Sequence, residues 1–191
     1  MKSPIEHKTK NMPVKPNFDS DYLYFLTTTA SGHKHFFKSD TIKRIIVDSF
    51  HFMRTNHWIN LYAFVIMPNH IHVILRALEK HTISDIMRDF KKHTSKQITR
   101  QFQAEDAKNI LLSIENSGRR DGNKVWEDNY DARDVFTTKF LQQKLDYIHH
   151  NPCQPHWNLS KFPEGYMWSS AAFYMVDKPC IIPIDDVREI L

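Results

Sequence analysis

The sequence is poor in cysteine and has no long apolar run, and both absences narrow the class of protein. Only Cys153 and Cys180 are present among 191 residues, too few for the disulfide framework of a small secreted domain. The longest apolar run covers residues 61–67, far short of the roughly 20 residues that a membrane helix needs. The first ten residues are polar, without the apolar core of a secretory signal. We therefore expect a cytoplasmic protein that makes no contact with a membrane.

The length and the charge balance set further limits. A chain of 191 residues can form one ordinary domain with a sizeable core, but it is too short for a TIM barrel of roughly 250 residues. Hydrophobic residues make up 41% and charged residues 25%, which is typical of a folded protein. The net charge of +4 is compatible with nucleic-acid binding without identifying it.

The hydrophobic pattern predicts an alternation of strands and helices. Aromatic, β-branched or apolar runs favour strands, and apolar residues three and four apart favour helices. The expected strands are 22–29, 58–67, 70–75 and 125–136, and the expected helices are 41–56, 82–101 and 137–150. The order β-α-β-β-α-β is typical of a ferredoxin-like split βαβ sandwich, an α+β fold with an antiparallel sheet, here followed by an extra helix.

The remaining segments suggest a simple domain organisation. Residues 1–20 are polar and proline-punctuated, which predicts a flexible basic arm. The main domain then covers 21–176, with a polar loop insertion and one short helix at about 104–124. Residues 153–191 are interrupted by prolines, and we expect a C-terminal tail over 177–191 with a short helix from Pro183.

Two His-x-His pairs stand in different surroundings. With twelve histidines in the chain, such a pair arises readily by chance, so context must decide. His33 and His35 follow Gly32 in a polar turn, and we interpret them as solvated surface. His70 and His72 lie in an apolar strand, so both imidazoles project from one face. With an oxygen ligand from elsewhere, this second pair can hold Mg²⁺ or Mn²⁺.

The helix over 137–150 offers a matching pair. Tyr147 and Asn151 are four residues apart and therefore share one helix face. A tyrosine oxygen can act as a nucleophile, and an asparagine carbonyl can bind a metal. The ordinary alternatives are a half-buried tyrosine and a helix-end residue before Pro152, and spacing alone favours these alternatives.

Two segments together resemble a known family. Residues 67–74 (MPNHIHVI) resemble the HUH (His-hydrophobe-His) motif of IS200/IS605-type single-tyrosine (Y1) transposases, and residues 144–152 (KLDYIHHNP) resemble the tyrosine helix of REP-associated tyrosine transposases. Further similar segments are 24–29 (YFLTTT), 84–92 (SDIMRDFKK) and 166–171 (YMWSSA). The resemblance runs in order over roughly residues 21–174.

This resemblance implies a site and an activity. Tyr147 would be the nucleophile, and His70, His72 and Asn151 would bind Mg²⁺ or Mn²⁺. The implied domain at 21–176 is an HUH catalytic domain with a ferredoxin-like fold. It would cleave and rejoin single-stranded DNA at hairpin-associated (REP, palindromic) sites through a covalent 5′-phosphotyrosine, in a bacterial, nucleoid-associated setting. A homodimer and a monomer both remain open.

Two other functions compete with this hypothesis. The chain could be a domesticated module that binds DNA hairpins without catalysis, although the intact tyrosine and histidines argue against it. It could also be a metal-dependent nuclease that uses water, and such an enzyme forms no covalent link to DNA.

Other features bear on DNA binding. A basic stripe on the second helix is either a phosphate-contacting face or a solvated one; it consists of Arg88, Lys92, Lys96 and Arg100. Trp126, Trp157 and Trp168 could stack bases, but core or loop-anchoring roles are more common. After Asn151-Pro152 the chain departs from relatives at 153–157 (CQPHW), which bears on DNA-sequence preference more than on chemistry.

Overall fold

A four-stranded antiparallel sheet organises the molecule. The computed structural model describes residues 22–78, 80–115 and 124–190. The strands are β1 (Tyr24–Thr29), β2 (Ile59–Ile66), β3 (His70–Ala77) and β4 (Asp131–Asp134). They pair in the order β2-β3-β1-β4, and every neighbouring pair is antiparallel. This order confirms the ferredoxin-like α+β sandwich expected from the sequence.

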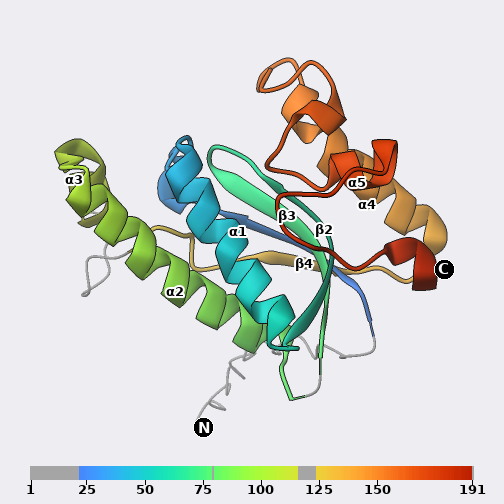
Figure 1. Ribbon diagram of the computed structural model, residues 1–191. Helices are drawn as coiled ribbons and strands as arrows, with labels where there is room; N and C mark the ends of the chain where they lie inside the picture. The colour runs from blue at the N-terminus through green and yellow to red at the C-terminus, as the bar shows by residue number, and fades with distance from the viewer. Residues whose placement is uncertain (1–21, 79, 116–123, 191) are drawn as a thin grey trace, which may run out of the picture.

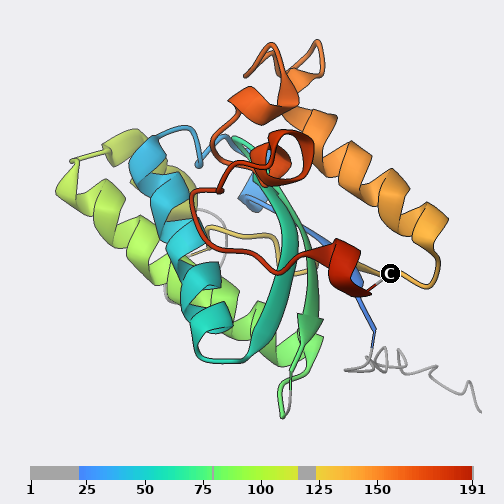
Figure 2. The same ribbon diagram turned by 45° about the vertical axis from the view of Figure 1, so that its right-hand side comes forward.

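Helices cover both faces of the sheet. On one face lie α1 (Asp40–Thr55) and α2 (Ile83–Ala104), with α3 (Lys108–Glu115) beside the end of α2 (Figure 1). Phe50 of α1 stacks on Phe90 of α2 with ring centroids 4.4 Å apart. On the other face lie α4 (Thr138–His150) and α5 (Ala171–Val176). Figure 2 shows the sheet between the α1–α2 pair and α4.

Side-chain caps fix where the three long helices begin. The hydroxyl oxygens of Ser39, Thr82 and Thr137 each accept a hydrogen bond from a backbone N–H of the first helical turn. Such caps satisfy donors that would otherwise lack a partner at a helix start. The capped start of α4 at Thr137 sets the helix phase and hence the face on which Tyr147 lies.

The strand register places the histidines. Thr27 of β1 pairs with His72 of β3, and Phe25 pairs with Ile74. Because side chains alternate across a strand, His70 and His72 share the α4 face of the sheet. The residues between them, such as Ile71 and Val73, point to the α1–α2 face and are buried there.

The C-terminal part of the chain covers the edge of the sheet at β2. Backbone N–H of Ile66 donates to the carbonyl of Trp168 at 2.9 Å. Further along the strand, the Asp185 carboxylate accepts from the backbone N–H of Leu61 at 2.8 Å and from the Arg54 guanidinium at 2.9 Å. A covered edge strand has no free N–H and C=O row to pair with another chain. The described part of the expected tail, residues 177–190, is therefore held against this edge of the sheet through Asp185.

Some expected element bounds were wrong. The strand expected at 125–136 pairs only as β4, while Trp126 forms an isolated bridge with Ala30. The stretch between Trp126 and β4 does not pair because the Lys91 ammonium donates hydrogen bonds to the carbonyls of residues 127, 128 and 129. The short C-terminal helix is a 3₁₀ turn at Val187–Ile190. Helix α5 was not expected.

Other expectations concern residues that the structure does not describe. The short helix expected within 104–124 is α3, and residues 116–123 of that polar segment lie outside the described residues. The expected arm at 1–20 lies outside them as well. Among the described residues, no helix is long and apolar enough to cross a membrane.

Candidate active site

His70 and His72 lie side by side on the α4 face of β3. Their ring centroids are 4.7 Å apart. His72 is 4% exposed, and the Phe25 ring stacks on it at 5.4 Å. The two imidazoles thus form the adjacent pair that the alternation of a strand predicts.

The two ring nitrogens of His72 have different surroundings. Nδ1 lies 2.8 Å from the hydroxyl oxygen of Thr27. Nε2 is buried and has no hydrogen-bond partner among the described residues. Burial lowers the pKa of His72 to about 3, with further lowering by His70 and Lys144. The ring is therefore neutral near pH 7, and a buried nitrogen without a partner suits a metal ligand.

His70 is held by the residue before it. Its Nδ1 lies 2.6 Å from Oδ1 of Asn69. Because a carbonyl oxygen only accepts, Nδ1 carries the proton in this arrangement and Nε2 keeps its lone pair. Burial lowers the pKa of His70 to about 4, and the neighbouring His33, His156 and His35 lower it further.

Tyr147 projects from α4 onto the histidine pair. Its ring centroid is 5.0 Å from that of His72 and 6.2 Å from that of Phe25, edge-on to both. The side chain is 48% exposed, and its hydroxyl makes no hydrogen bond with any described residue. The oxygen is thus open to a substrate from solvent while the ring is fixed against the sheet.

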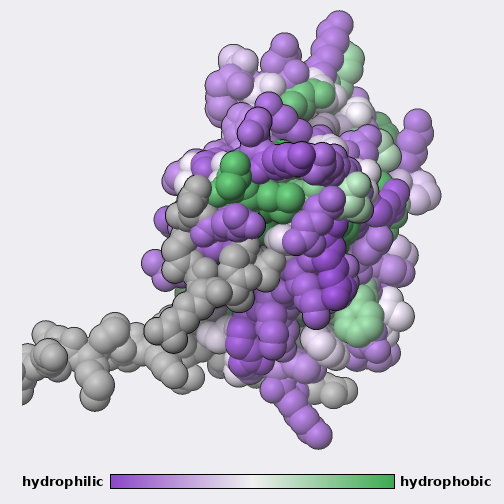
Figure 3. Space-filling model, turned by 90° about the vertical axis from the view of Figure 1, so that its left-hand side faces the viewer, coloured by the Kyte–Doolittle hydropathy of each residue, from purple (hydrophilic) through white to green (hydrophobic). Residues whose placement is uncertain are grey.

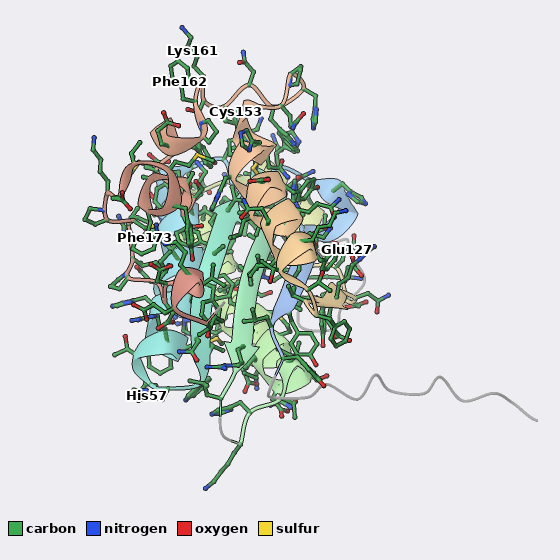
Figure 4. All side chains as sticks on the ribbon, turned by 90° about the vertical axis from the view of Figure 1, so that its right-hand side faces the viewer. His57, Glu127, Cys153, Lys161, Phe162 and Phe173 are labelled. Atoms are coloured by element: carbon green, nitrogen blue, oxygen red, sulfur yellow. The ribbon has the colours of Figure 1, made fainter. Side chains whose placement is uncertain are left out.

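Asn151 lies one turn beyond Tyr147. The chain continues past α4 as a 3₁₀ turn, Asn151–Cys153, and Asn151 keeps helical backbone angles. Its side chain is 5% exposed. It lines an open pocket of about 470 Å³ together with Asn69, His70, Tyr147, Gln154, His156 and Trp157. Figure 4 views this face of the molecule, with Cys153 marking the end of α4. The four residues expected from the sequence are therefore brought together.

The pocket's donor set fits a divalent ion. His70 and Asn151 line the pocket, and the ring of His72, with its buried unpartnered Nε2, lies directly beside that of His70 at 4.7 Å. Among the described residues, no three His, Cys, Asp or Glu side chains gather as a metal site. The amide oxygens lining the pocket are of the type that Mg²⁺ and Mn²⁺ accept beside imidazole.

The histidines next to Tyr147 in sequence have other partners. His149 is buried, and its Nε2 lies 2.9 Å from the Ser170 hydroxyl, which itself contacts the backbone of Phe64 in β2. Nδ1 of His150 donates to the carbonyl of Asp146 at 2.9 Å. His149 therefore anchors α4 to the sheet.

A lysine lies beside the nucleophile candidate. Lys144 is one turn before Tyr147, and its ammonium sits 4.6 Å from the Phe25 ring centroid and 5.6 Å from that of Tyr147. No described carboxylate forms an ion pair with it. This positive charge is therefore available to an anionic group that reaches Tyr147.

Helix α2, which carries the basic stripe, lies on the opposite side of the sheet from α4, which carries Tyr147 (Figure 2). Arg88 pairs with Asp85 at 2.6 Å and with Asp89 at 2.9 Å. Lys92, Lys96 and Arg100 are exposed and have no carboxylate partner among the described residues. Figure 3, which views the side of α2 and α3, shows a mainly hydrophilic surface. The stripe is thus separate from the pocket.

Sequence reasoning did not find all the residues around the site. Thr27 contacts His72 only because β1 pairs with β3 in this register, and no local pattern reveals a cross-strand partner. His33 and His35 are exposed, as expected, but they lie closer to His70 than the polar-turn interpretation suggested. The loop between β1 and α1 folds back toward the site, since Asn69 Nδ2 donates to the carbonyl of His33.

Comparison with known proteins identifies the family. A family model described as "Transposase IS200 like" matches residues 20–151. No curated protein matches the chain. A solved REP-associated tyrosine transposase bound to a REP hairpin superposes with a TM-score of 0.62 and 16% identity, covering 91% of this chain and 92% of that chain. A transposase-like protein from Deinococcus radiodurans R1 covers 75% of this chain and 95% of its own, with a TM-score of 0.46 and 20% identity. Because the family model spans most of the chain, from before β1 to Asn151, the chain belongs to the IS200-like transposase family.

Proposed function

We propose that this protein cleaves and rejoins single-stranded DNA through a covalent link between Tyr147 and a 5′-phosphate. One observation carries the proposal. The Tyr147 ring packs edge-on against His72 at 5.0 Å, and its unbonded hydroxyl opens into the pocket that His70 and Asn151 line. A nucleophile, two imidazoles and an amide thus converge from two elements far apart in sequence.

His70, His72 and Asn151 are the residues that would hold Mg²⁺ or Mn²⁺. When bound there, the ion supplies Lewis-acid polarisation of a phosphate oxygen. Thr27 and Asn69 keep the two rings in place through their contacts with the Nδ1 atoms. With Nδ1–H donating, each ring presents an Nε2 lone pair, so the protein prearranges the donors before the ion arrives.

The strand-transfer step conserves a phosphodiester. The Tyr147 hydroxyl loses its proton to solvent as its oxygen forms a bond to phosphorus, the bond from phosphorus to the 3′-oxygen breaks, and the departing oxygen takes up a proton to become a free 3′-hydroxyl. Rejoining is the reverse attack by a 3′-hydroxyl on the phosphotyrosine. Because the number of phosphodiester bonds is unchanged, no nucleotide cofactor is needed. The Lys144 ammonium lies beside the Tyr147 ring, and a fixed positive charge there stabilises the negative charge that the phosphate carries in the transition state.

We infer that the DNA partner carries a hairpin. The support comes from the structurally similar transposase, which is bound to a REP hairpin, together with the net positive charge of +4. The single strand beside a hairpin can bring its phosphate close to the exposed Tyr147 hydroxyl. A duplex is stiffer, and its paired bases make the same approach harder.

A covalent-adduct assay tests the proposal. A pool of DNA hairpins with randomised single-stranded flanks is incubated with the protein and Mn²⁺, and the products are separated on a denaturing gel. We expect a protein–DNA adduct that resists denaturation and is absent for Tyr147→Phe. Cleaved DNA without an adduct, equally in both proteins, would instead support a water-using nuclease. Binding without cleavage would support a hairpin-binding module.

A second set of variants tests the metal ligands. We expect His70→Ala and His72→Ala each to abolish Mn²⁺-dependent cleavage, because each removes a nitrogen donor. His33→Ala is the matched control, since His33 belongs to the other His-x-His pair and is exposed. Equal losses in all three variants would contradict the assignment of the ligands to β3.

A further inference from the structure

Trp157 differs from Trp126 and Trp168 in its surroundings. Trp126 is buried and donates from Nε1 to Thr94 at 2.8 Å, and Trp168 donates to Asp40 at 2.9 Å and is 4% exposed. Both therefore serve the core. Trp157 is only half-buried, and its Nε1 makes no hydrogen bond with any described residue. A partly exposed indole with a free N–H suits a ligand better than a core role.

Trp157 also joins two hollows in the surface. The catalytic pocket of about 470 Å³ and a second pocket of about 500 Å³ share His156 and Trp157 as lining residues. The second pocket extends from there toward Tyr166, Trp168 and the start of α1. A strand that passes over Tyr147 can therefore continue across Trp157 into the second pocket without leaving the surface.

The lining of the second pocket combines rings with cations. His35 and His156 flank Trp157, with ring centroids 5.6 Å and 5.4 Å from it. Lys38 is exposed on the rim and has no carboxylate partner among the described residues. The one acidic lining residue, Asp40, is engaged by Lys43 at 3.2 Å and by the Trp168 indole. An aromatic ring beside a free cation is a combination that binds unpaired nucleotides.

We propose that this second pocket binds an unpaired nucleotide of the DNA next to the scissile phosphate, with its base stacked on Trp157. The adjacent phosphate then lies within reach of Lys38. The proposal rests on the proposed function, because it takes the single strand at Tyr147 as its starting point. Because stacking accepts any base, the pocket mainly positions the strand. A base that can also hydrogen-bond with the polar groups of the lining binds there more tightly than the other bases.

Binding measurements separate this role from catalysis. The background is Tyr147→Phe, which cannot form an adduct, and the probe is the hairpin from the randomised pool that this variant binds most tightly. We expect Trp157→Ala to weaken binding about 5-fold to 150-fold, the range for loss of one stacked base. Trp157→Phe retains a ring and should lose much less. Trp58→Ala is the control, since Trp58 is half-buried on another part of the surface, beside Phe52 and His81.

Abasic probes locate the contact. Each nucleotide of the single-stranded flank is replaced in turn by an abasic site, and binding is compared between Tyr147→Phe alone and Tyr147→Phe combined with Trp157→Ala. We expect one position next to the cleavage site where base removal weakens binding only while Trp157 is present. Melting temperatures of both variants show whether the fold is intact, and the ring-retaining variant keeps the test valid if Trp157→Ala unfolds.

The outcomes distinguish the two proposals. In one outcome the wild-type protein forms an adduct while no nucleotide position is coupled to Trp157 and Trp157→Ala binds as tightly as Trp58→Ala. That result overturns the nucleotide pocket and leaves the proposed function standing. A coupled position without any adduct in the wild type supports the pocket and overturns the covalent mechanism. Failure of every hairpin in the pool to bind overturns both.

Discussion

The hydroxyl of Thr27 and Nδ1 of His72 are 2.8 Å apart across the β1–β3 ladder. If the ring is to bind a metal through Nε2, Nδ1 must carry the proton and donate to the threonine oxygen. Thr27 is then a positioning residue that sets both the tautomer and the orientation of His72. Partners of this kind commonly matter nearly as much to a metal as the ligands themselves.

Removing that hydroxyl should weaken metal binding. We expect Thr27→Val to lower the affinity for Mn²⁺ about 10-fold to 100-fold, while cleavage recovers at high Mn²⁺. Calorimetric titration with Mn²⁺ and a metal titration of cleavage both measure the effect. The control is Thr28→Val, because the Thr28 hydroxyl is buried on the other face without a hydrogen-bond partner among the described residues. A shift in the control as large as in Thr27→Val would show a general effect of altering β1.

Asn151 is tested by the same titration. We expect Asn151→Ala to weaken Mn²⁺ binding about 10-fold or more, with cleavage restored at high Mn²⁺ because both imidazoles remain. If the residue only ends the helix, the variant should lose about 1 kcal/mol of folding free energy at most. An unchanged titration curve would remove Asn151 from the site.

The basic stripe of α2 predicts a salt-dependent contribution to DNA binding. If Lys92, Lys96 and Arg100 contact phosphates, each change to alanine should reduce the slope of log affinity against log salt by about 1 for a double-stranded stem. Arg88→Ala should have the smallest effect, because its guanidinium already pairs with Asp85 and Asp89. Slopes identical to that of the wild-type protein would identify the stripe as a solvated face.

His149 should matter for stability and not for chemistry. Its ring fills a buried site against Tyr174 and contacts the Ser170 hydroxyl, so we expect His149→Ala to cost about 2–3 kcal/mol of unfolding free energy. His150→Ala should cost little, because that side chain is exposed. Denaturant unfolding measures both. Loss of adduct formation in a folded His149→Ala protein would contradict the anchoring role.

The fold could be predicted because its signals are local. The alternation in β3, the capping threonine of α2 and the asparagine–proline end of α4 each follow from neighbouring residues. The length of the strand expected at 125–136 was overestimated, because the ammonium of Lys91, which is distant in sequence, donates hydrogen bonds to backbone carbonyls in the first half of that segment. The covering of β2 by the C-terminal segment also depends on a distant pair, Arg54 and Asp185.

The candidate site likewise contains residues that the sequence could indicate and residues that it could not. His70, His72, Tyr147 and Asn151 were expected because the two segments that carry them resemble the motifs of single-tyrosine transposases; the spacing of each pair only places its two side chains on one face of a strand or helix. Thr27 was assigned no role, since it acts through strand register, and Trp157 could not be told apart from Trp126 and Trp168 as a base-stacking residue, since its position depends on a loop after α4. No periodic pattern encodes either of these contacts.

The most direct measurement is peptide mapping of the covalent adduct. The wild-type protein is incubated with Mn²⁺ and the hairpin pool, the DNA is trimmed by nuclease, and the digested protein is analysed by mass spectrometry. We expect a nucleotide on the peptide that contains Tyr147, linked through its 5′-phosphate, and a free 3′-hydroxyl on the released strand. A nucleotide on any other residue, or cleavage with no modified peptide, would contradict a Tyr147 nucleophile.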